Sequence, residues 1–119
     1  MKDRIRESDT RPDPDEAFNW LQGWYMAHCD DDWEHSYGVT IETIDNPGWT
    51  IRIDLDGTEL ATRPFRPRHR DYPGGDWYDI QVADGAFVAT CSPLNLSWCM
   101  TEFRLWAQTR PKRPRHLTC

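Results

Sequence analysis

The hydrophobic positions at the start of the chain recur at helical spacing. Residues 13–16 have the composition of a helix start: Asp13 is placed to cap it, Pro14 takes the first helical position, and Glu16 stands where it closes a capping box with Asp13. We predict a helix that runs to about Cys29. Its apolar and aromatic residues share one face, which we expect to pack on a sheet: Ala17, Phe18, Leu21, Trp24, Tyr25 and His28.

Five segments are predicted to form strands. Period-two alternation predicts the first two, 37–44 and 49–55; a shorter strand follows at 58–62, and 77–83 and 86–91 are strand-like runs. The turn sequence Asp45-Asn46-Pro47-Gly48 joins the first two segments and Asp84-Gly85 joins the last two, so each pair is predicted to form a hairpin. Asp56-Gly57 is predicted to turn the chain into the third strand, which Pro64 ends, so that the first three strands would form an antiparallel meander.

The rest of the chain is predicted to complete an α+β fold. Residues 63–75, with three prolines, two glycines and four arginines, have the composition of an exposed loop. Ser92-Pro93 is predicted to open a C-terminal helix. We therefore expect a single domain in which an antiparallel sheet of about five strands is flanked on one face by an N-terminal and a C-terminal helix. Its expected boundaries are a disordered leader, the domain and a basic, proline-rich tail: residues 1–12, 13–108 and 109–119.

Composition supports one folded domain. The 119 residues include seven Trp, four Tyr and four Phe, which supply an aromatic core despite a mean hydropathy of −0.83. No apolar run approaches the ~18 residues that a membrane span needs, and the charged start of the chain is unlike a signal peptide. The cysteines are widely spaced, which is typical of reduced thiols and predicts a cytoplasmic location: Cys29, Cys91, Cys99 and Cys119.

Charge is distributed unevenly along the chain. Residues 13–62 contain twelve acidic residues and one base, Arg52, whereas residues 63–119 contain nine bases and five acidic residues. An acidic half of this kind repels nucleic acid and attracts a basic protein by long-range steering. The same pattern also serves solubility alone, and both interpretations stay open at this point.

The densest group of candidate metal ligands is the run Asp30-Asp31-Asp32-Trp33-Glu34-His35. A calcium loop needs alternating ligands and a glycine at its sixth position, where this run has His35, so a solvated loop is favoured. His28, Cys29 and His35 lack a fourth ligand at a spacing typical of zinc sites. We therefore predict neither a metal nor a cofactor.

Nucleophilic and nucleic-acid-binding patterns are weak. Arg104 follows Cys99 by five residues, as in the anion-binding loops of sulfurtransferases, but bulky residues lie between the two and no catalytic residue is predicted. The basic segment 63–70 and the basic tail could contact phosphates, which makes a nucleic-acid-binding module an alternative. A protein contact or a solvated loop is the favoured interpretation, so we predict no nucleic-acid partner.

Strings of rare residues at fixed offsets run from residue 20 to residue 55. They are Trp20-Leu21-x-x-Trp24-Tyr25, Trp33-Glu34-His35-x-Tyr37-Gly38-Val39, Ile41-Glu42-Thr43-x-Asp45-Asn46-Pro47-Gly48-Trp49 and Ile51-x-Ile53-Asp54-Leu55. These strings resemble the immunity protein 53 family of bacterial polymorphic toxin systems. Cys91-x-Pro93-x-Asn95-Leu96 and Phe103-x-x-Trp106-Ala107 resemble the closing segment of that family, so the resemblance covers about residues 17–108.

The resemblance implies a cytoplasmic antidote that binds a cognate toxin domain and blocks it. Such a protein needs a complementary surface and no catalytic residues, and an acidic surface suits a basic toxin such as a nuclease. The residues expected to contact the toxin form one loop and a second acidic patch: Asp30, Asp31, Asp32, Trp33, Glu34 and His35, with Asp54, Asp56 and Glu59.

The main alternative is a small enzyme or ligand-binding domain. In that case Glu34, His35 and Tyr37 would converge in a pocket lined by Trp33 and Trp49. Neighbouring residues on a strand point to opposite faces, so Glu34 and His35 would act together only from a loop.

Overall fold

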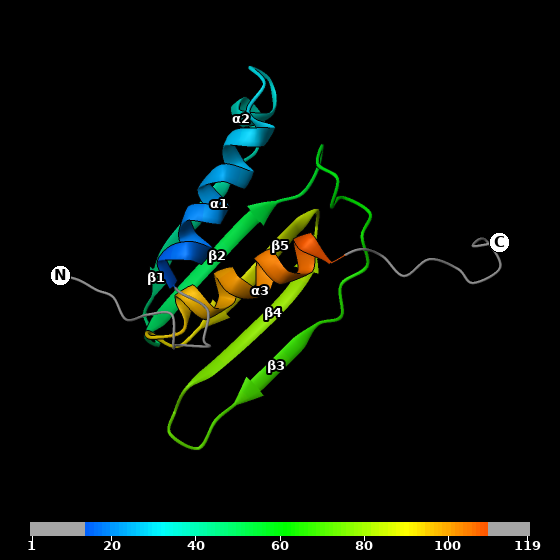
Figure 1. Cartoon of the computed structure of the whole chain (residues 1–119). Coiled ribbons are helices and arrows are strands. Elements are labelled where there is room, and N and C mark those ends of the chain that lie inside the picture. The colour runs from blue at the N-terminus through cyan, green and yellow to red at the C-terminus, as the bar shows by residue number, and fades with distance from the viewer. Residues whose placement is uncertain (1–13, 110–119) are drawn as a thin grey trace, which may run out of the picture.

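The computed structural model describes residues 14–109 and has the predicted α+β architecture. Two long helices lie on the same face of one five-stranded antiparallel sheet (Figure 1). The predicted leader, the cap at Asp13 and the tail from residue 110 lie outside the described residues. The elements are α1 (Pro14–His28), α2 (Trp33–Ser36), β1 (Val39–Ile44), β2 (Gly48–Asp54), β3 (Arg68–Asp71), β4 (Trp77–Ala83), β5 (Ala86–Cys91) and α3 (Leu96–Gln108).

The sheet has the strand order β1-β2-β5-β4-β3, and every neighbouring pair is antiparallel. Both predicted hairpins, β1–β2 and β4–β5, are confirmed. Ala89 of β5 lies between Ile51 of β2 and Ile80 of β4, so the most apolar strand occupies the centre of the sheet. This position suits β5 because the side chains of a central strand are flanked by those of the strands on both sides.

Aromatic side chains fill the space between the sheet and the helices. Phe103 of α3 is fully buried and makes edge-to-face contacts with Trp24 and Phe87, at ring-centroid distances of 5.2 and 5.0 Å. From α1, the predicted inner residues Ala17, Leu21 and Trp24 are buried. Phe18 and Tyr25, predicted on the same inner face, are exposed instead, because they lie beside the edge strand β1. Edge-to-face geometry of this kind adds to the stabilisation that burial of the rings provides.

The predicted third strand at residues 58–62 is wrong. Thr58 instead forms turns: its Oγ1 donates to the carbonyl of Leu55 at 2.7 Å and accepts the amide of Leu60 at 3.1 Å. A threonine hydroxyl that bonds the local backbone in this way competes with strand pairing. Leu60 is fully buried, and the edge of β2 that this segment was expected to occupy pairs with β5, so the predicted meander is also wrong.

The exposed loop predicted for residues 63–75 contains the edge strand β3 and docks on α3. The guanidinium of Arg63 donates to the carbonyls of Trp106, Ala107 and Thr109 at 2.8–3.0 Å, which satisfies the open carbonyls at the end of α3. Arg68 pairs with Glu102 of α3. All four residues of β3 are exposed, so the strand lacks the alternation that predicts strands from sequence.

The C-terminal helix begins at Leu96 and not at Ser92-Pro93. Ser92 is buried and holds the entry to the helix instead: its Oγ accepts the amide of Trp77 at 3.1 Å and the side-chain amide of Asn95 at 3.0 Å. These bonds fix a turn before the helix because the serine hydroxyl satisfies groups from both β4 and the loop.

The pairing of β2 with β5 makes Gly48 intolerant of any side chain. A Cβ at this position would lie 2.1 Å from the backbone oxygen of Cys91, whereas nothing lies within 4 Å of a Cβ at Gly74. We expect Gly48→Ala to lower the free energy of unfolding by about 1–3 kcal/mol, and Gly74→Ala to change it little. Urea-induced unfolding of the two variants measures the difference, and equal stabilities would contradict the β2–β5 register.

Candidate partner-binding site

The connection between α1 and α2 is built by two of its own carboxylates. The Oδ1 of Asp30 accepts the amides of Asp32 and Trp33 at 3.0 and 2.9 Å. In return, the carboxylate of Glu34 accepts the amides of Asp30 and Asp31, both at 2.9 Å. This reciprocal arrangement satisfies the open amides at the start of α2 in the manner of a capping box.

These bonds also fix the charge of the connection. The amides of Trp33 and Asp32 hold the pKa of Asp30 below its ordinary value. Backbone amides, its own first and then those of Asp30 and Asp31, lower the pKa of Glu34 in the same way. The carboxylates of Asp31 and Asp32 accept no hydrogen bond within residues 14–109 and are exposed. Asp30 and Glu34 therefore shape the loop, and Asp31 and Asp32 remain exposed.

Trp33 ties this connection to the segment that follows β2. Its side chain is only 6% exposed, and its indole Nε1 donates to the carbonyl of Asp56 at 2.8 Å. The ring lies against Gly57, which has a φ of +81°. A Cβ at this position would lie 3.1 Å from the ring, so the absence of a side chain allows the close approach. Trp33 therefore supports the predicted acidic surface from beneath.

A second link joins α1 to Glu59. The carboxylate of Glu59 accepts the indole Nε1 of Trp24 at 3.2 Å and lies 2.7 Å from the Nε2 of His28. Partial burial acts to raise the pKa of Glu59, but the hydrogen bonds from His28, its own amide and Trp24 outweigh burial and lower it. The two acidic patches predicted from the sequence are therefore brought together at one end of the molecule.

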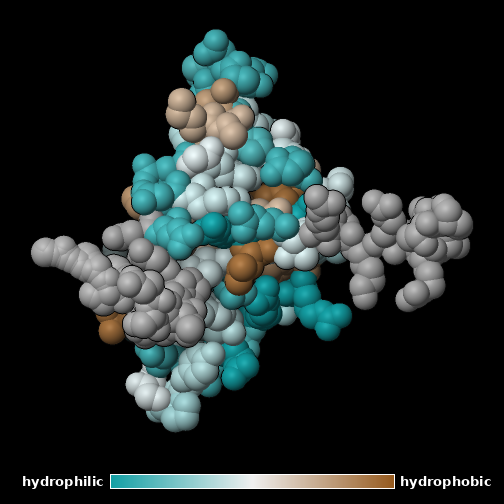
Figure 2. Space-filling model, in the orientation of Figure 1, coloured by the Kyte–Doolittle hydropathy of each residue, from teal (hydrophilic) through white to brown (hydrophobic). Residues whose placement is uncertain are grey.

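We call this surface the acidic end. The part of it that the α1–α2 connection forms is the hydrophilic top of the molecule in Figure 2, in the orientation of Figure 1. Sequence reasoning did not include Asp84, which belongs to it: a Cβ on the next residue, Gly85, would lie 2.8 Å from the carboxylate of Asp56. Asp84 reaches this position because β5 pairs with β2. The acidic end consists of Asp30, Asp31, Asp32, Glu34, Asp56, Glu59 and Asp84.

Two other predicted site residues lie at the border of the acidic end. The Oδ2 of Asp54 accepts the amide of Gly38 at 3.0 Å, and its Oδ1 lies 3.3 Å from the Nε of Arg52. Asp54 therefore joins the two strands at the end of the β1–β2 pair away from the turn, and Arg52 partly balances its charge. His35 is exposed on α2.

The alternative pocket of Glu34, His35 and Tyr37 is not assembled. The carboxylate of Glu34 is bound to backbone amides, and Trp33 and Trp49 lie near opposite ends of β2, a strand whose ends are roughly 20 Å apart. Trp49 instead donates its Nε1 to the carbonyl of Pro93 at 3.0 Å. The described residues therefore offer no geometry in which this set acts together.

The remaining chemical candidates are structural in the described part of the chain. Within residues 14–109, no group of three or more His, Cys, Asp or Glu is placed to hold a metal ion. Cys99 is fully buried, and its hydrogen bond with Cys91, together with burial, raises the pKa of its thiol far above the ordinary value, which removes its nucleophilicity.

Among the helices of residues 14–109, none has the length and hydropathy of a membrane span.

The basic segment is largely occupied by contacts within the molecule. Arg63 binds the end of α3, Arg68 pairs with Glu102, and Arg70 lies over the ring of Tyr72 at 5.3 Å. Phosphate binding needs guanidinium groups that are free to turn toward the backbone of a nucleic acid. The structure therefore gives little support to the nucleic-acid-binding alternative over residues 63–70.

The sequence model of immunity protein 53 matches residues 18–108, most of the chain. The chain belongs to the immunity protein 53 family. No curated protein and no solved structure matches it. Membership of the immunity protein 53 family supports an immunity role and implies a toxin protein as the partner.

Trp33 provides a test of how the acidic end is held. Trp33→Phe keeps an aromatic ring but removes the hydrogen bond to Asp56, so we expect the free energy of unfolding to fall by about 1–2 kcal/mol. Tyr37→Phe, which removes a polar group from a half-exposed ring next to Trp33, serves as the control and should change it little. Urea-induced unfolding followed by circular dichroism measures both; an unchanged Trp33→Phe variant would contradict this role.

Acid should weaken the acidic end through Glu34. Because its pKa is lowered in the folded state, its stabilisation is complete above the ordinary value of 4.5 and is lost as the pH falls through the folded value. We expect Glu34→Gln to be less stable than the unaltered protein at about pH 6, and the difference to narrow as the pH falls below 4.5. Urea midpoints measured from about pH 6 into the acid range test the prediction, and a difference that stays constant below pH 4.5 would contradict it.

Proposed function

We propose that this protein is an immunity protein that binds a cognate polymorphic toxin domain through the acidic end and thereby neutralises it. The observation that carries the proposal is the convergence of seven carboxylates from three separate segments on one surface. Asp30 to Glu34, Asp56 to Glu59 and Asp84 are far apart in sequence and meet only in the fold. Family membership supports a toxin as the partner.

A basic toxin domain, such as a nuclease, fits this surface by charge. A nuclease active site must hold phosphates and therefore concentrates positive charge around its catalytic groups. Complementary charge raises the rate of encounter and disfavours partners of the wrong sign. Within the α1–α2 connection, Asp31 and Asp32 are the most available acids, because their carboxylates accept no hydrogen bond from residues 14–109, whereas those of Asp30 and Glu34 bind backbone amides.

Neutralisation of this kind requires no catalytic step by the antidote. The proposed domain spans residues 13–108, with the predicted leader and tail on either side, and it acts in the cytoplasm of the cell that makes the toxin. Trp33 and His35 lie beneath and beside the proposed contact surface, and Asp54 lies at its border.

The acidic end can be tested with Asp31→Asn/Asp32→Lys. Asn is chosen at residue 31 because the φ of +76° there suits Asn better than Lys. The probe is the C-terminal toxin domain of the large secreted protein encoded beside this gene. We expect association to slow by about tenfold at low salt and to lose much of its salt dependence. Stopped-flow association rates at several salt concentrations measure the effect.

The control has the same change in net charge at a different place. The variant Asp71→Asn/Asp79→Lys alters exposed acids of β3, the edge strand opposite β1, and of its neighbour β4. We expect this variant to associate with the toxin domain at close to the original rate. Equal slowing by both variants would mean that net charge alone matters, and unchanged binding by Asp31→Asn/Asp32→Lys would place the interface elsewhere.

A further inference from the structure

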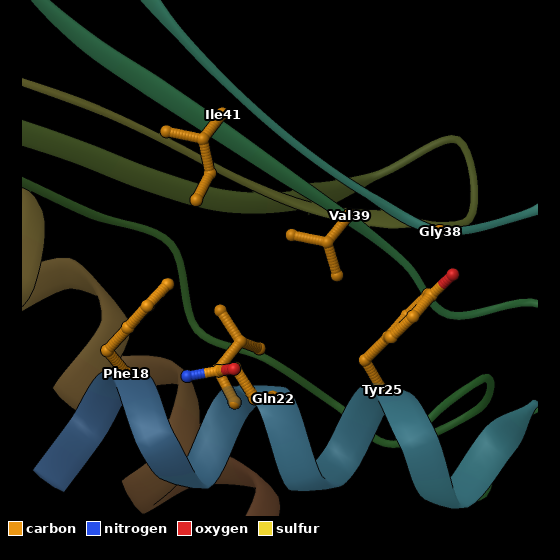
Figure 3. Close-up of a pocket in the computed structure, with 7 residues that line it drawn as sticks. Phe18, Gln22, Tyr25, Gly38, Val39 and Ile41 are labelled. Atoms are coloured by element: carbon orange, nitrogen blue, oxygen red, sulfur yellow. The ribbon is translucent and has the colours of Figure 1, made fainter.

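An apolar groove lies between α1 and the edge strand β1. Phe18, Leu21 and Tyr25 form the helix side, and Val39 and Ile41 form the strand side, of a cavity of about 300 Å³. Figure 3 shows Phe18, Gln22 and Tyr25 pointing from α1 toward Val39 and Ile41 across this space. Phe18 is 46% exposed, Tyr25 38% and Ile41 37%, so rings and a branched side chain face solvent together.

The backbone of β1 adds open hydrogen-bonding groups to this groove. The amide of Asp54 donates to the carbonyl of Gly38 at 3.0 Å, which makes Gly38 and Asp54 a hydrogen-bonded pair of the ladder. In an antiparallel ladder such pairs alternate with pairs whose amides and carbonyls point away from each other. By the β1–β2 register, Val39, Ile41 and Thr43 are of the second kind, so their amides and carbonyls point to the open edge of the sheet.

The two edges of the sheet differ in how they are protected. β3, at one edge, has four residues, all exposed, and its sequence Arg68-His69-Arg70-Asp71 is fully charged or titratable, which is a common device against unwanted pairing. β1, at the other edge, has six residues, and the side chains on its groove side are Val39, Ile41 and Thr43. Within residues 14–109 no backbone group bonds the open edge of β1.

We propose that β1 is completed by an extended segment of the toxin domain, which adds to the edge of the sheet as a sixth strand. This inference rests on the proposed function. Main-chain hydrogen bonds to Val39, Ile41 and Thr43 hold the added strand, and every second side chain of that strand enters the groove against Phe18 and Tyr25. Addition of a strand beside a helix in this way is a general mode of peptide recognition.

The negative charge around the groove indicates which segment can occupy it. Residues 14–51, which form α1, α2 and β1 with the start of β2, contain eight acids and no Lys or Arg: Asp15, Glu16, Asp30, Asp31, Asp32, Glu34, Glu42 and Asp45. A second copy of this chain would bring the same charges face to face, and like charges oppose strand pairing. The leader, residues 1–12, has four bases against three acids and only Met1 and Ile5 as apolar residues, so it offers neither a strong positive charge nor alternating apolar side chains. The added strand therefore has apolar residues at alternate positions and Lys or Arg around them.

Amide hydrogen exchange in the complex tests the pairing directly. The amides of Val39, Ile41 and Thr43 should exchange at least tenfold more slowly when the protein is bound to the toxin domain encoded beside its gene. The amides of Thr40 and Glu42, which face β2, are the internal reference, because they are already bonded in the free protein. Exchange is followed by NMR on the full chain, free and in complex.

Substitutions test the groove and the edge separately. Phe18→Ala should weaken toxin binding at least tenfold, whereas Met26→Ala, a 74% exposed residue of the same helix outside the groove, should not. Thr43→Pro removes one outward amide at a residue that does not line the cavity, while leaving the β1–β2 bonds in place, and should weaken binding to a similar extent. A melting curve shows whether this variant folds; if it does not, Phe18→Ala and the exchange data decide.

The outcomes distinguish this inference from the proposed function. Salt-sensitive binding with unchanged exchange at Val39, Ile41 and Thr43 would overturn the added strand and leave the acidic end as the interface. Absence of any complex would overturn both. Slow exchange of the same amides in the free chain, with twice the expected mass in light scattering, would overturn the toxin strand as occupant and assign the edge to a second copy.

Discussion

A single buried tryptophan, Trp33, holds the acidic end of this protein to its core. It stands in the middle of a run of carboxylates, yet its ring is covered and contacts the rings of Trp24 and Tyr25, at centroid distances of 6.1 and 5.9 Å. Its indole also bonds the segment that follows β2. Charged side chains cannot be buried without partners, so the carboxylates of the acidic end stay at the surface. The apolar residue among them, Trp33, is therefore the one that anchors this surface to the core.

Assembling like charges opposes folding, and the structure offsets this repulsion locally. Asp30 and Glu34 each accept two backbone amides from their own loop, and Glu59 accepts bonds from His28 and Trp24. Hydrogen bonds to a carboxylate are stronger than those between neutral groups, and they favour the charged form. The remaining charges stay in water, where a partner can neutralise them. Under the proposed function, stability and recognition therefore fall on different members of one acidic cluster.

The sequence predicted the elements that short-range patterns determine. The helix face of Ala17 and Leu21 and the two hairpins depend on neighbouring residues, and all are confirmed. The partner of β2 depends on long-range packing, and the predicted turn into residues 58–62 could not reveal that β5 occupies that edge of β2. β3 escaped detection because an exposed edge strand has no apolar face, and its arginines contact α3.

The same limit applies to the candidate site. Its acids were identifiable from composition, because twelve acidic residues against one base within residues 13–62 stand out without any structure. Their convergence in space could not be identified from the sequence, because it depends on the hydrogen bond between Trp33 and Asp56. Asp84 belongs to the group only because the strand order places it there. The groove at β1 was hidden for a related reason: Phe18 and Tyr25 fit the inner face of a helix equally well whether or not a strand lies fully beneath them.

The acidic end and the groove differ in the step of association that each is suited to influence. Charge acts over about 8–10 Å at physiological salt and so affects the encounter before contact is made. Backbone pairing and apolar burial act only after contact, and they govern how slowly a complex dissociates. α1 forms one side of the groove and leads directly into the connection that carries Asp31 and Asp32. Under the two proposals, a partner steered to these acids arrives near the open edge of β1, so that rapid capture is joined to slow release.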